Sequence, residues 1–428
     1  MSVLGGTVLA SRNVTDADPK EPEVEPSALE RELQSFDALN SWSLYYEQIQ
    51  NASFVKTDSL KTSSARLAEN RLKNRYRDIC PYDETRVVLH HPASGDYINA
   101  SYVQIDEIPS RRYILTQGPL QLTTQHFWQM VWEQRCPAII MLNRILEKGT
   151  IKCFAYFPRL SETKNFKEVG LSVRCVSESH CGAHILREFD LTNTTTNETH
   201  CVLHFHYMRW PDFGVPGSPS SMLNFLWSVR RTGVLKNPEF PCVIHCSAGV
   251  GRSGTFVLID LALVLIESHG SMQDVDLTKI LLSLRQCRMG IIQTAQQLRY
   301  SYRAVVEGGT LLLSTPPSER PFLQFGSDED AEADNFAGAD DDCDLEDDDE
   351  DEDEDDDDDH DEGGDEEEDE CTDDEEAHFK RNFLRSLKNK MFVPNTPHVF
   401  ENSDVSVDEG SEGEAADGED EEEEEEED

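Results

Sequence analysis

The sequence lacks any uninterrupted apolar run of about 18 or more residues, the length that a membrane-spanning helix needs. Residues 1–10 are mildly apolar but have no basic segment before them, so a secretory signal peptide is not indicated. The 11 cysteines include no Cys-x-x-Cys pair and follow no framework spacing. These absences argue against a membrane span, a zinc site and a disulfide scaffold, and they favour reduced thiols in a cytosolic or nuclear protein.

Basic residues are scarce in the last quarter of the chain. Residues 327–428 contain 52 of the 85 Asp and Glu residues but 5 of the 38 Lys and Arg residues, and they account for the whole formal charge of −47. Such dense like charge cannot collapse into a core, which predicts a disordered acidic regulatory tail over residues 313–428. Residues 1–27 are polar and contain several prolines, and we expect a disordered leader there.

Residues 378–392 interrupt the acidic tail with a basic amphipathic segment. Apolar residues recur there at helical spacing, with Lys and Arg between them. Three interpretations are open: a helix for a partner groove or membrane surface, part of a nuclear import signal, or pairing with the acidic flanks. The tail as a whole either inhibits the domain of its own chain or binds another protein, and the sequence does not identify that partner.

Residues 28–312 have the composition of a folded domain, and their patterns predict an α/β (α+β) fold with a twisted mixed sheet flanked by helices. We expect strands at 87–90, 97–103, 113–116, 138–142 and 241–245, and an antiparallel meander over 171–207. We expect helices at 123–135, 218–230, 275–287 and 293–306, with one or two more between 27 and 50, capped by Ser27 or Ser41.

The stretch from Val243 to Thr255 joins an apolar strand to a helix through a loop of small residues. Such a loop turns successive backbone N–H groups inward before a helix N-terminus and forms a concave site for a phosphate dianion. Cys246 lies at the base of this loop, and Arg252 offers a planar fork to two phosphate oxygens. The pattern favours a thiolate nucleophile that attacks phosphorus and forms a cysteinyl-phosphate.

A second candidate lies in the string Trp-Pro-Asp-Phe-Gly-Val-Pro, which begins at Trp210. Two prolines and a glycine predict a loop, with the tryptophan as its anchor. Cleavage of a phosphate ester needs a proton on the departing oxygen, and Asp212 is the candidate donor. Neither a kinase glycine loop nor a His-Arg-Asp motif accompanies this Asp-Phe-Gly, so a kinase is not indicated.

These residues resemble the signature and general-acid loops of the classical protein tyrosine phosphatases, and in particular the non-receptor type 1 and type 2 enzymes with their invertebrate relatives. The resemblance extends over about residues 41–308. It implies hydrolysis of phosphotyrosine in proteins without a metal or other cofactor. It also implies a negative regulator of tyrosine-kinase signalling, whose substrates are receptor or cytoplasmic tyrosine kinases or the substrates of those kinases.

The resemblance gives roles to two further stretches. In the loop Lys-Asn-Arg-Tyr-Arg-Asp, otherwise a charged turn, Tyr76 stacks on the substrate ring and sets the pocket depth. Asp78 there accepts hydrogen bonds from the substrate backbone, and Arg77 favours acidic neighbours of the phosphotyrosine. In Asn-Arg-x-x-Glu-Lys-Gly, Glu147 holds Arg252, and the following Lys152 reaches the general-acid loop.

The resemblance also assigns the second chemical step. Gln293 positions the water that hydrolyses the cysteinyl-phosphate, Gln297 assists, and Ser253 helps to expel the thiolate. Cys246 is then expected to be reversibly oxidisable. The expected substrate-binding residues are Tyr76, Arg77, Asp78, Asp212, Phe213, Ser247, Ala248, Gly249, Val250, Gly251, Arg252, Gln293 and Gln297, with His245, Glu147, Lys152 and Trp210 in support.

Two positions and two other functional classes stay open. Arg285 matches one arginine of a second phosphotyrosine pocket in the type 1 enzyme, but Gln50 stands in place of the other. A catalytically silent phosphotyrosine-binding module and a scaffold that acts through its acidic tail are the alternatives to an enzyme. We expect a cytoplasmic monomer without a nucleic acid partner, with the nucleus or a peripheral membrane contact as alternatives.

Overall fold

The computed structural model describes residues 25–90, 95–211 and 214–326. All of these residues lie in the first of the two compact units into which the chain divides. The candidate acid Asp212 and its neighbour Phe213 lie outside the described residues, as do residues 1–24 and the acidic tail from 327 to 428 with its basic segment at 378–392. In the described ranges, no helix is at once long enough and apolar enough to cross a bilayer.

The described strands are β1 (Arg86–Val88), β2 (Tyr97–Val103), β3 (Tyr113–Thr116), β4 (Ala138–Met141), β5 (Leu146–Glu147), β6 (Thr150–Ile151), β7 (Thr163–Phe166), β8 (Leu171–His180), β9 (His184–Asn193), β10 (Thr199–Tyr207) and β11 (Cys242–His245). One sheet has the order β1-β2-β3-β11-β4-β10-β9-β8-β7, and β5 pairs with β6. The central strands β3, β11, β4 and β10 run parallel. Every residue of β3, β4 and β11 is buried, as expected for strands covered on both faces.

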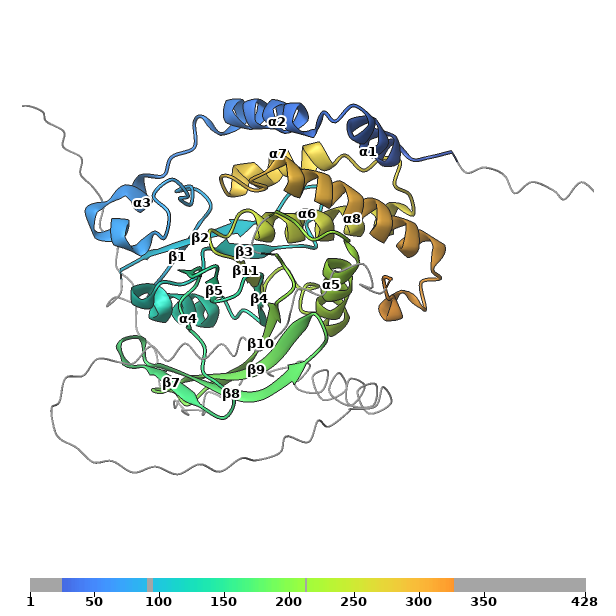
Figure 1. The fold of residues 1–428 in the computed structure, drawn as a ribbon. Helices are drawn as coiled ribbons and strands as arrows, with labels where there is room; N and C mark the ends of the chain where they lie inside the picture. Colours follow the sequence, from blue (N-terminus) through green and yellow to red (C-terminus); the bar gives the residue numbers. More distant parts are fainter. Residues whose placement is uncertain (1–24, 91–94, 212–213, 327–428) are drawn as a thin grey trace, which may run out of the picture. The chain divides into compact units, whose positions relative to one another are not determined.

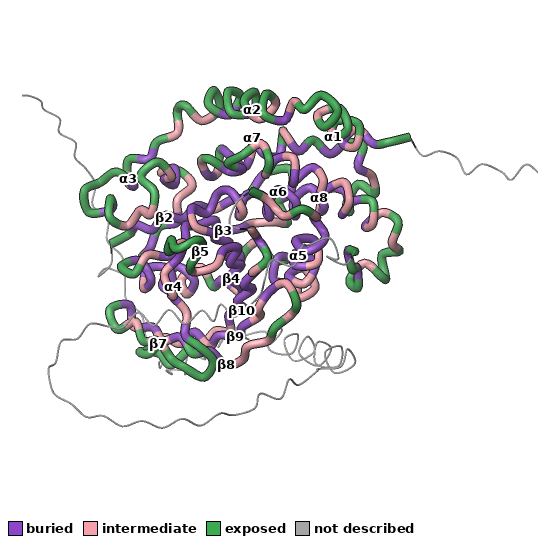
Figure 2. The backbone as a smooth tube through the Cα atoms, viewed as in Figure 1, coloured by how far each residue is buried: buried purple, intermediate pink, exposed green. Residues whose placement is uncertain are grey.

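The described helices are α1 (Ala28–Ala38), α2 (Trp42–Thr57), α3 (Ser63–Arg66), α4 (Thr124–Glu133), α5 (Ser220–Thr232), α6 (Arg252–His269), α7 (Leu277–Cys287) and α8 (Ala295–Ser314), with short 3₁₀ turns η1 (Ala68–Lys73), η2 (Gln121–Thr123), η3 (Lys167–Val169) and η4 (Arg320–Phe322). Helices α6, α7 and α8 pack together beside β3 and β11, and α4 lies on the other side of the sheet (Figure 1). The central strands are buried, whereas α1 and α2 expose most of their outer surface (Figure 2). The predicted mixed sheet between helices is confirmed.

The two serines predicted as helix caps differ in their hydrogen bonds. Ser27 caps α1 in a reciprocal capping box with Glu30, whereas Ser41 makes no side-chain bond at the start of α2.

The last helix was predicted to end at residue 306 but continues to Ser314. Gly308 and Gly309 do not end it, because they allow close helix packing: a Cβ at Gly309 would lie 2.7 Å from the sulfur of Met272.

The described chain also continues beyond residue 312, the predicted end of the domain. Leu323 and Phe325 are buried, and Phe325 exchanges two hydrogen bonds of 2.9 Å with the side chain of Asn224 on α5. The indole of Trp227, also on α5, donates to the carbonyl of Arg320 at 2.6 Å. The segment after α8 therefore packs on the domain, while the domain boundaries themselves remain a prediction.

Candidate active site

The loop that contains Cys246 begins where β11 ends. Because β11 lies between β3 and β4, its carboxyl end opens at the middle of the sheet, which is the usual place for ligands in open α/β sheets. The loop occupies residues 246–251, and α6 begins at Arg252. The sheet therefore presents a cysteine, a loop and a helix N-terminus at one central point.

The backbone carbonyls of this loop are held by the surrounding structure. The fully buried Arg288 donates from Nε to the carbonyl of Gly249 at 3.0 Å and from Nη2 to the carbonyl of Ala248 at 3.1 Å. Burial lowers the pKa of Arg288 to about 10, so it stays charged at neutral pH. By contrast, the N–H groups of residues 247–251 have no hydrogen-bond partner among the described residues. These free donors form the concave anion site that the loop sequence predicts.

Two glycines of the loop lie close to neighbouring groups, and the first of them is required by space. Gly249 has a φ of +71°, and a Cβ there would lie 1.9 Å from the carbonyl oxygen of Thr116 at the end of β3. At Gly251 a Cβ would lie 2.8 Å from Oε1 of Gln293 and 3.0 Å from Nε2 of Gln297. The first glycine lets the loop fit against the neighbouring strand, and the second leaves room for the two glutamines.

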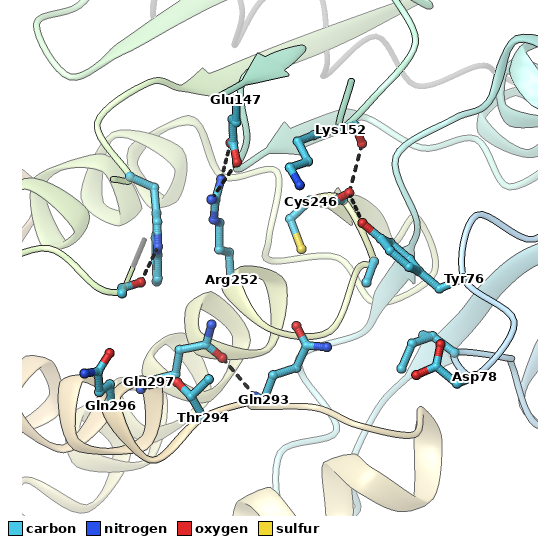
Figure 3. A pocket seen from close by; sticks show the side chains of 15 residues that line it. Tyr76, Asp78, Glu147, Lys152, Cys246, Arg252, Gln293, Thr294, Gln296 and Gln297 are labelled. Atoms are coloured by element: carbon cyan, nitrogen blue, oxygen red, sulfur yellow. Dashed lines mark hydrogen bonds and ion pairs between the residues drawn. The ribbon is translucent and has the colours of Figure 1, made fainter. Parts of the chain in front are cut away.

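A pocket of about 410 Å³ opens above the loop, with the sulfur of Cys246 at its base (Figure 3). Cys246 is 5% exposed. Arg252 reaches across the pocket and binds Glu147 with both terminal nitrogens, at 2.5 and 2.9 Å. Glu147 comes from the β5–β6 hairpin and is buried. A bidentate pair of this kind fixes the plane of the guanidinium.

The loop of residues 73–78 forms one wall of the pocket. The hydroxyl of Tyr76 lies 2.8 Å from Oγ of Ser247, which in turn donates to the carbonyl of Lys152 at 3.1 Å. Arg75 anchors this wall, because it donates to the carbonyls of Gly118 and Pro119 at 3.0 and 2.8 Å. The Tyr76 ring lies beside Cys246 (Figure 3), and its exposure of 36% places it at the rim of the pocket.

The opposite wall begins just before α8. Gln293 donates its backbone N–H to Oε1 of Gln297 at 2.9 Å, and the hydroxyl of Thr294 caps the helix by accepting from the N–H of Gln297. Both glutamine side chains line the pocket across from Lys152 (Figure 3). Ser253 lies below the pocket in the first turn of α6, fully buried, and its hydroxyl has no partner among the described residues.

Trp210 stands at the start of the predicted general-acid loop. Its indole donates to the carbonyl of Gly214 at 3.2 Å, and the guanidinium carbon of Arg252 lies 5.7 Å from its ring. The tryptophan is 2% exposed and thus holds both ends of the loop near the pocket. The position of Asp212 within that loop is outside the described residues.

Most of the residues predicted for the site meet around this pocket. Those that line it are Tyr76, Asp78, Glu147, Lys152, Trp210, Cys246, Ser247, Ala248, Arg252, Gln293 and Gln297. Arg77 is exposed and does not line it. Ile79, Thr294 and Gln296 line it and were not predicted.

Two buried arginines lie behind the site, and neither was predicted from the sequence to support it. Nothing in the sequence marked Arg288 as the donor that holds the loop carbonyls, because an arginine in a polar stretch is usually exposed. Arg285, matched by resemblance to a second pocket, is 4% exposed and donates to the carbonyls of Ile291 and Ile292 at 2.9 and 3.0 Å. It therefore holds the chain that leads to Gln293.

Known proteins share the sequence that builds this site. The family model described as "Protein-tyrosine phosphatase" matches residues 70–307. The chain is 48% identical to the human tyrosine-protein phosphatase non-receptor type 2 over 304 residues, which is 71% of each chain. It is 45% identical over 285 residues to tyrosine-protein phosphatase non-receptor type 61F of Drosophila melanogaster, covering 65% of this chain and 51% of that relative. With tyrosine-protein phosphatase 1 of Caenorhabditis elegans it shares 38% identity over 276 residues, 63% of this chain and 26% of the other.

Proposed function

Since the chain belongs to the protein-tyrosine phosphatases, and within them to the non-receptor type, we propose that it hydrolyses phosphotyrosine proteins through a cysteinyl-phosphate on Cys246. One observation supports this mechanism most strongly. The sulfur of Cys246 lies at the base of a pocket whose loop N–H groups have no partner among the described residues, and Glu147 fixes the plane of the Arg252 guanidinium there. A phosphate dianion bound there faces the sulfur.

In the first step, the thiolate of Cys246 attacks phosphorus, and the bond from phosphorus to the tyrosine oxygen breaks. The N–H groups of residues 247–251 and the guanidinium of Arg252 bind the equatorial oxygens, where charge develops in the transition state. Asp212 gives its proton to the departing tyrosine oxygen. The products of this step are the free tyrosine side chain and the cysteinyl-phosphate.

In the second step, Gln293 positions a water molecule with the help of Gln297, and Asp212 takes up a proton from that water as it attacks phosphorus. The bond from phosphorus to Cys246 breaks, and inorganic phosphate leaves. The hydroxyl of Ser253, which has no partner among the described residues, donates to the returning thiolate. Apart from the attacking water, both steps use only backbone and side-chain groups of this chain.

Selectivity for phosphotyrosine follows from the depth of the pocket. Tyr76 stands at its rim and Cys246 at its base, so a substrate must reach past the ring before its phosphate meets the sulfur. The aromatic ring of phosphotyrosine supplies that reach and stacks on Tyr76, whereas phosphoserine is too short. Asp78 binds the substrate backbone, and the exposed Arg77 favours acidic residues beside the phosphotyrosine.

The wider role is that of a negative regulator of tyrosine-kinase signalling. The catalytic domain of residues 28–312, with the packed segment that follows it to residue 326, lies between the leader 1–27 and the acidic tail, and acts as a monomer. Its compartment is the cytoplasm, with the nucleus or a peripheral membrane contact as alternatives. These assignments rest on the family and on the charge distribution of the sequence.

The mechanism is tested with the full chain, a chelator, and two peptides that differ only in phosphotyrosine or phosphoserine. We expect turnover of the phosphotyrosine peptide alone, abolished in Cys246→Ser, and a phosphate adduct on Cys246 in Gln293→Ala when the reaction is quenched and measured by mass spectrometry. Equal turnover of both peptides, or full activity of Cys246→Ser, contradicts the proposal. Peptide binding without any turnover would instead favour a phosphotyrosine-binding module.

A further inference from the structure

Three side chains without exposed surface form a hydrogen-bonded row beneath the pocket. His204 comes from β10, Tyr156 from the segment between β6 and β7, and His245 from the last position of β11. The Tyr156 hydroxyl lies 2.9 Å from Nε2 of His204 and 2.8 Å from Nε2 of His245. Nδ1 of His245 lies 3.4 Å from the carbonyl oxygen of Cys246. The row runs from the middle of the sheet to the backbone of the nucleophile.

The number of protons in this row allows two arrangements. A tyrosine hydroxyl has one proton, so Tyr156 donates to one imidazole and accepts from the other. In the first arrangement His204 donates from Nε2 to Tyr156, Tyr156 donates to Nε2 of His245, and His245 is protonated at Nδ1. In the second arrangement each direction is reversed, so that His204 is protonated at Nδ1 and His245 has a bare lone pair at Nδ1.

Both ends of the row favour the first arrangement. Nδ1 of His204 has no partner among the described residues, and a proton there would be a buried, unpaired donor, which proteins rarely contain. At the other end, a bare Nδ1 of His245 would face the lone pairs of the Cys246 carbonyl, whereas a protonated Nδ1 donates to them. These two independent observations, one at each end of the row, therefore favour the same arrangement of protons.

The imidazoles keep this direction because both are neutral. Burial lowers the pKa of His245 to about 3, and burial together with the charge of Arg187 lowers the pKa of His204 well below its usual range. The ring centroids of Phe157 and Phe189 lie 4.7 and 5.4 Å from that of His204, so its surroundings are apolar. Each imidazole thus has one proton, and its tautomer is set by its neighbour.

We propose that His204 is a positioning residue for the nucleophile, because it sets the tautomer of His245 through Tyr156 and so maintains the hydrogen bond to the Cys246 carbonyl. That carbonyl belongs to the same peptide group as the N–H of Ser247, the first donor of the anion site. The row thereby fixes the orientation of this donor. The inference rests on the proposed role of Cys246, although His204 itself touches neither substrate nor sulfur.

The tautomers are measured directly by ¹⁵N NMR of the full chain labelled at the histidine imidazoles. Signals are assigned from their absence in His204→Gln and His245→Asn. We expect His204 protonated at Nε2 and His245 at Nδ1, and we expect His204→Leu to change the His245 signal towards the other tautomer. The inference is overturned if the two histidines have the reverse tautomers. It is also overturned if the His245 signal in His204→Leu is the same as in the unaltered chain. Because this measurement needs no turnover, its failure is distinct from failure of the proposed mechanism.

A kinetic test separates positioning from packing. We expect His204→Leu to lower kcat about threefold to tenfold with KM for a phosphotyrosine peptide unchanged, and His204→Gln, which keeps a donor, to recover most of the loss. Phe157→Leu alters the same packing without breaking the row and serves as the matched control, with kcat near that of the unaltered chain. In a Tyr156→Phe background, His204→Leu should cause no further loss of kcat, because the hydrogen bonds that connect His204 to His245 are already absent. An equal loss in both backgrounds, or in the control, shows a packing role and overturns the inference.

Discussion

At the scale of single residues, the orientation of Arg252 depends on one carboxylate. Glu147 is buried and accepts from both terminal nitrogens of the guanidinium, while the carbonyl of Leu142 accepts from Nη1 at 3.2 Å. Nη2 also donates to the carbonyl of Pro211 at 3.5 Å, and Nε has no partner among the described residues, so Nε is the donor left for a ligand in the pocket. A phosphate bound by this fork is therefore placed by a residue that does not touch it.

The first prediction is that Glu147→Gln lowers kcat/KM roughly tenfold to a hundredfold. The amide oxygen of the glutamine still accepts one hydrogen bond, but its N–H₂ group faces the guanidinium and cannot accept the other. With one bond of the pair lost, the plane of the Arg252 guanidinium is no longer fixed. Steady-state kinetics with a phosphotyrosine peptide measure the change.

Asp37→Asn is the matched control, because Asp37 forms a similar two-bond pair with Arg299 at 2.6 and 3.0 Å and does not line the pocket. We expect it to leave kcat/KM unchanged. Glu147→Gln with the kinetics of the unaltered chain would show that the pair does not orient Arg252.

Residues that act directly on a ligand were easier to predict from the sequence than residues that support them. Cys246, Arg252 and Gln293 stand in dense local motifs, and all three line one pocket. Arg288 and Tyr156 have no such signal, because their roles depend on burial and on partners far away in the sequence. The physical reason is that a side chain's environment is set by tertiary packing, which residue type alone does not specify.

At the scale of elements, the loop after β11 is shaped by its fit against β3. The carbonyl of Thr116 at the end of β3 occupies the space where any side chain at Gly249 would begin. The loop and the strand end can therefore approach only through a glycine with positive φ. This contact makes the shape of the anion site sensitive to a single methyl group.

The second prediction is that Gly249→Ala abolishes most activity, whereas Gly182→Ala does not. Both glycines have φ near +70°, but a Cβ at Gly182, in the turn between β8 and β9, would meet nothing within 4 Å. Gly182→Ala should cost about 1 kcal/mol of unfolding free energy through its backbone conformation alone. Urea unfolding and peptide turnover of both variants check this, and equal activity of the two would contradict it.

The third prediction concerns a buried charge that joins three elements. Asp260 on α6 has no exposed surface and binds Arg111, Tyr113 on β3 and Arg230 on α5. Burial alone raises the pKa of Asp260, but the charges of Arg230 and Arg111 lower it to about 2. Because the unfolded value is about 3.9, the carboxylate stabilises the fold above about pH 4, and this contribution is lost as the pH falls from about 4 to about 2.

We therefore expect Asp260→Asn to lower the free energy of unfolding at pH 7 by about 3–5 kcal/mol, since it leaves the partly buried Arg111 and Arg230 without this buried counterion. The variant should also show a weaker loss of stability between pH 4 and pH 2. Denaturant titrations at several pH values measure both effects. Asp106→Asn, at an exposed position, is the control, and a variant whose pH profile parallels the unaltered chain would refute the assignment.

The bounds of strands and helices were predicted well where one apolar periodicity continued without interruption. β2 and β3 have the predicted bounds, and the buried apolar runs of β4 and β11 lie within one residue of them. The end of α8 was missed because Gly308 and Gly309 have low helix propensity, and only tertiary packing shows why they stay helical. The order of the strands in the sheet was not predicted, since it depends on long-range pairing.

At the scale of the whole molecule, charge is divided between two parts of the chain. Residues 1–326 are formally neutral, and residues 327–428 hold the entire charge of −47. The exposed Arg77 next to the pocket offers a cationic site at its mouth. We therefore predict that the polyanionic segment of the same chain competes there with acidic phosphopeptides, because its effective concentration is high.

The fourth prediction is that a chain ending at residue 326 has a KM for an acidic phosphotyrosine peptide roughly threefold or more below that of the full chain at low salt. The difference should disappear at 0.5 M salt, because screening shortens the reach of the charges. A peptide with basic flanking residues is the control and should show no gain. Equal kcat/KM for both chains at low salt would exclude inhibition by the tail and favour partner binding.

The position of β11 in the sheet has a consequence for biosynthesis. β3 and β4 are made early, yet they do not pair with each other, because β11, residues 242–245, lies between them. Until the ribosome has released that strand, both neighbours have an open edge, and such edges attract chaperones or other chains. The strand that completes the sheet also delivers Cys246. A nascent chain, or one truncated before residue 242, therefore has no assembled anion site, and phosphatase activity begins only when the last central strand is in place.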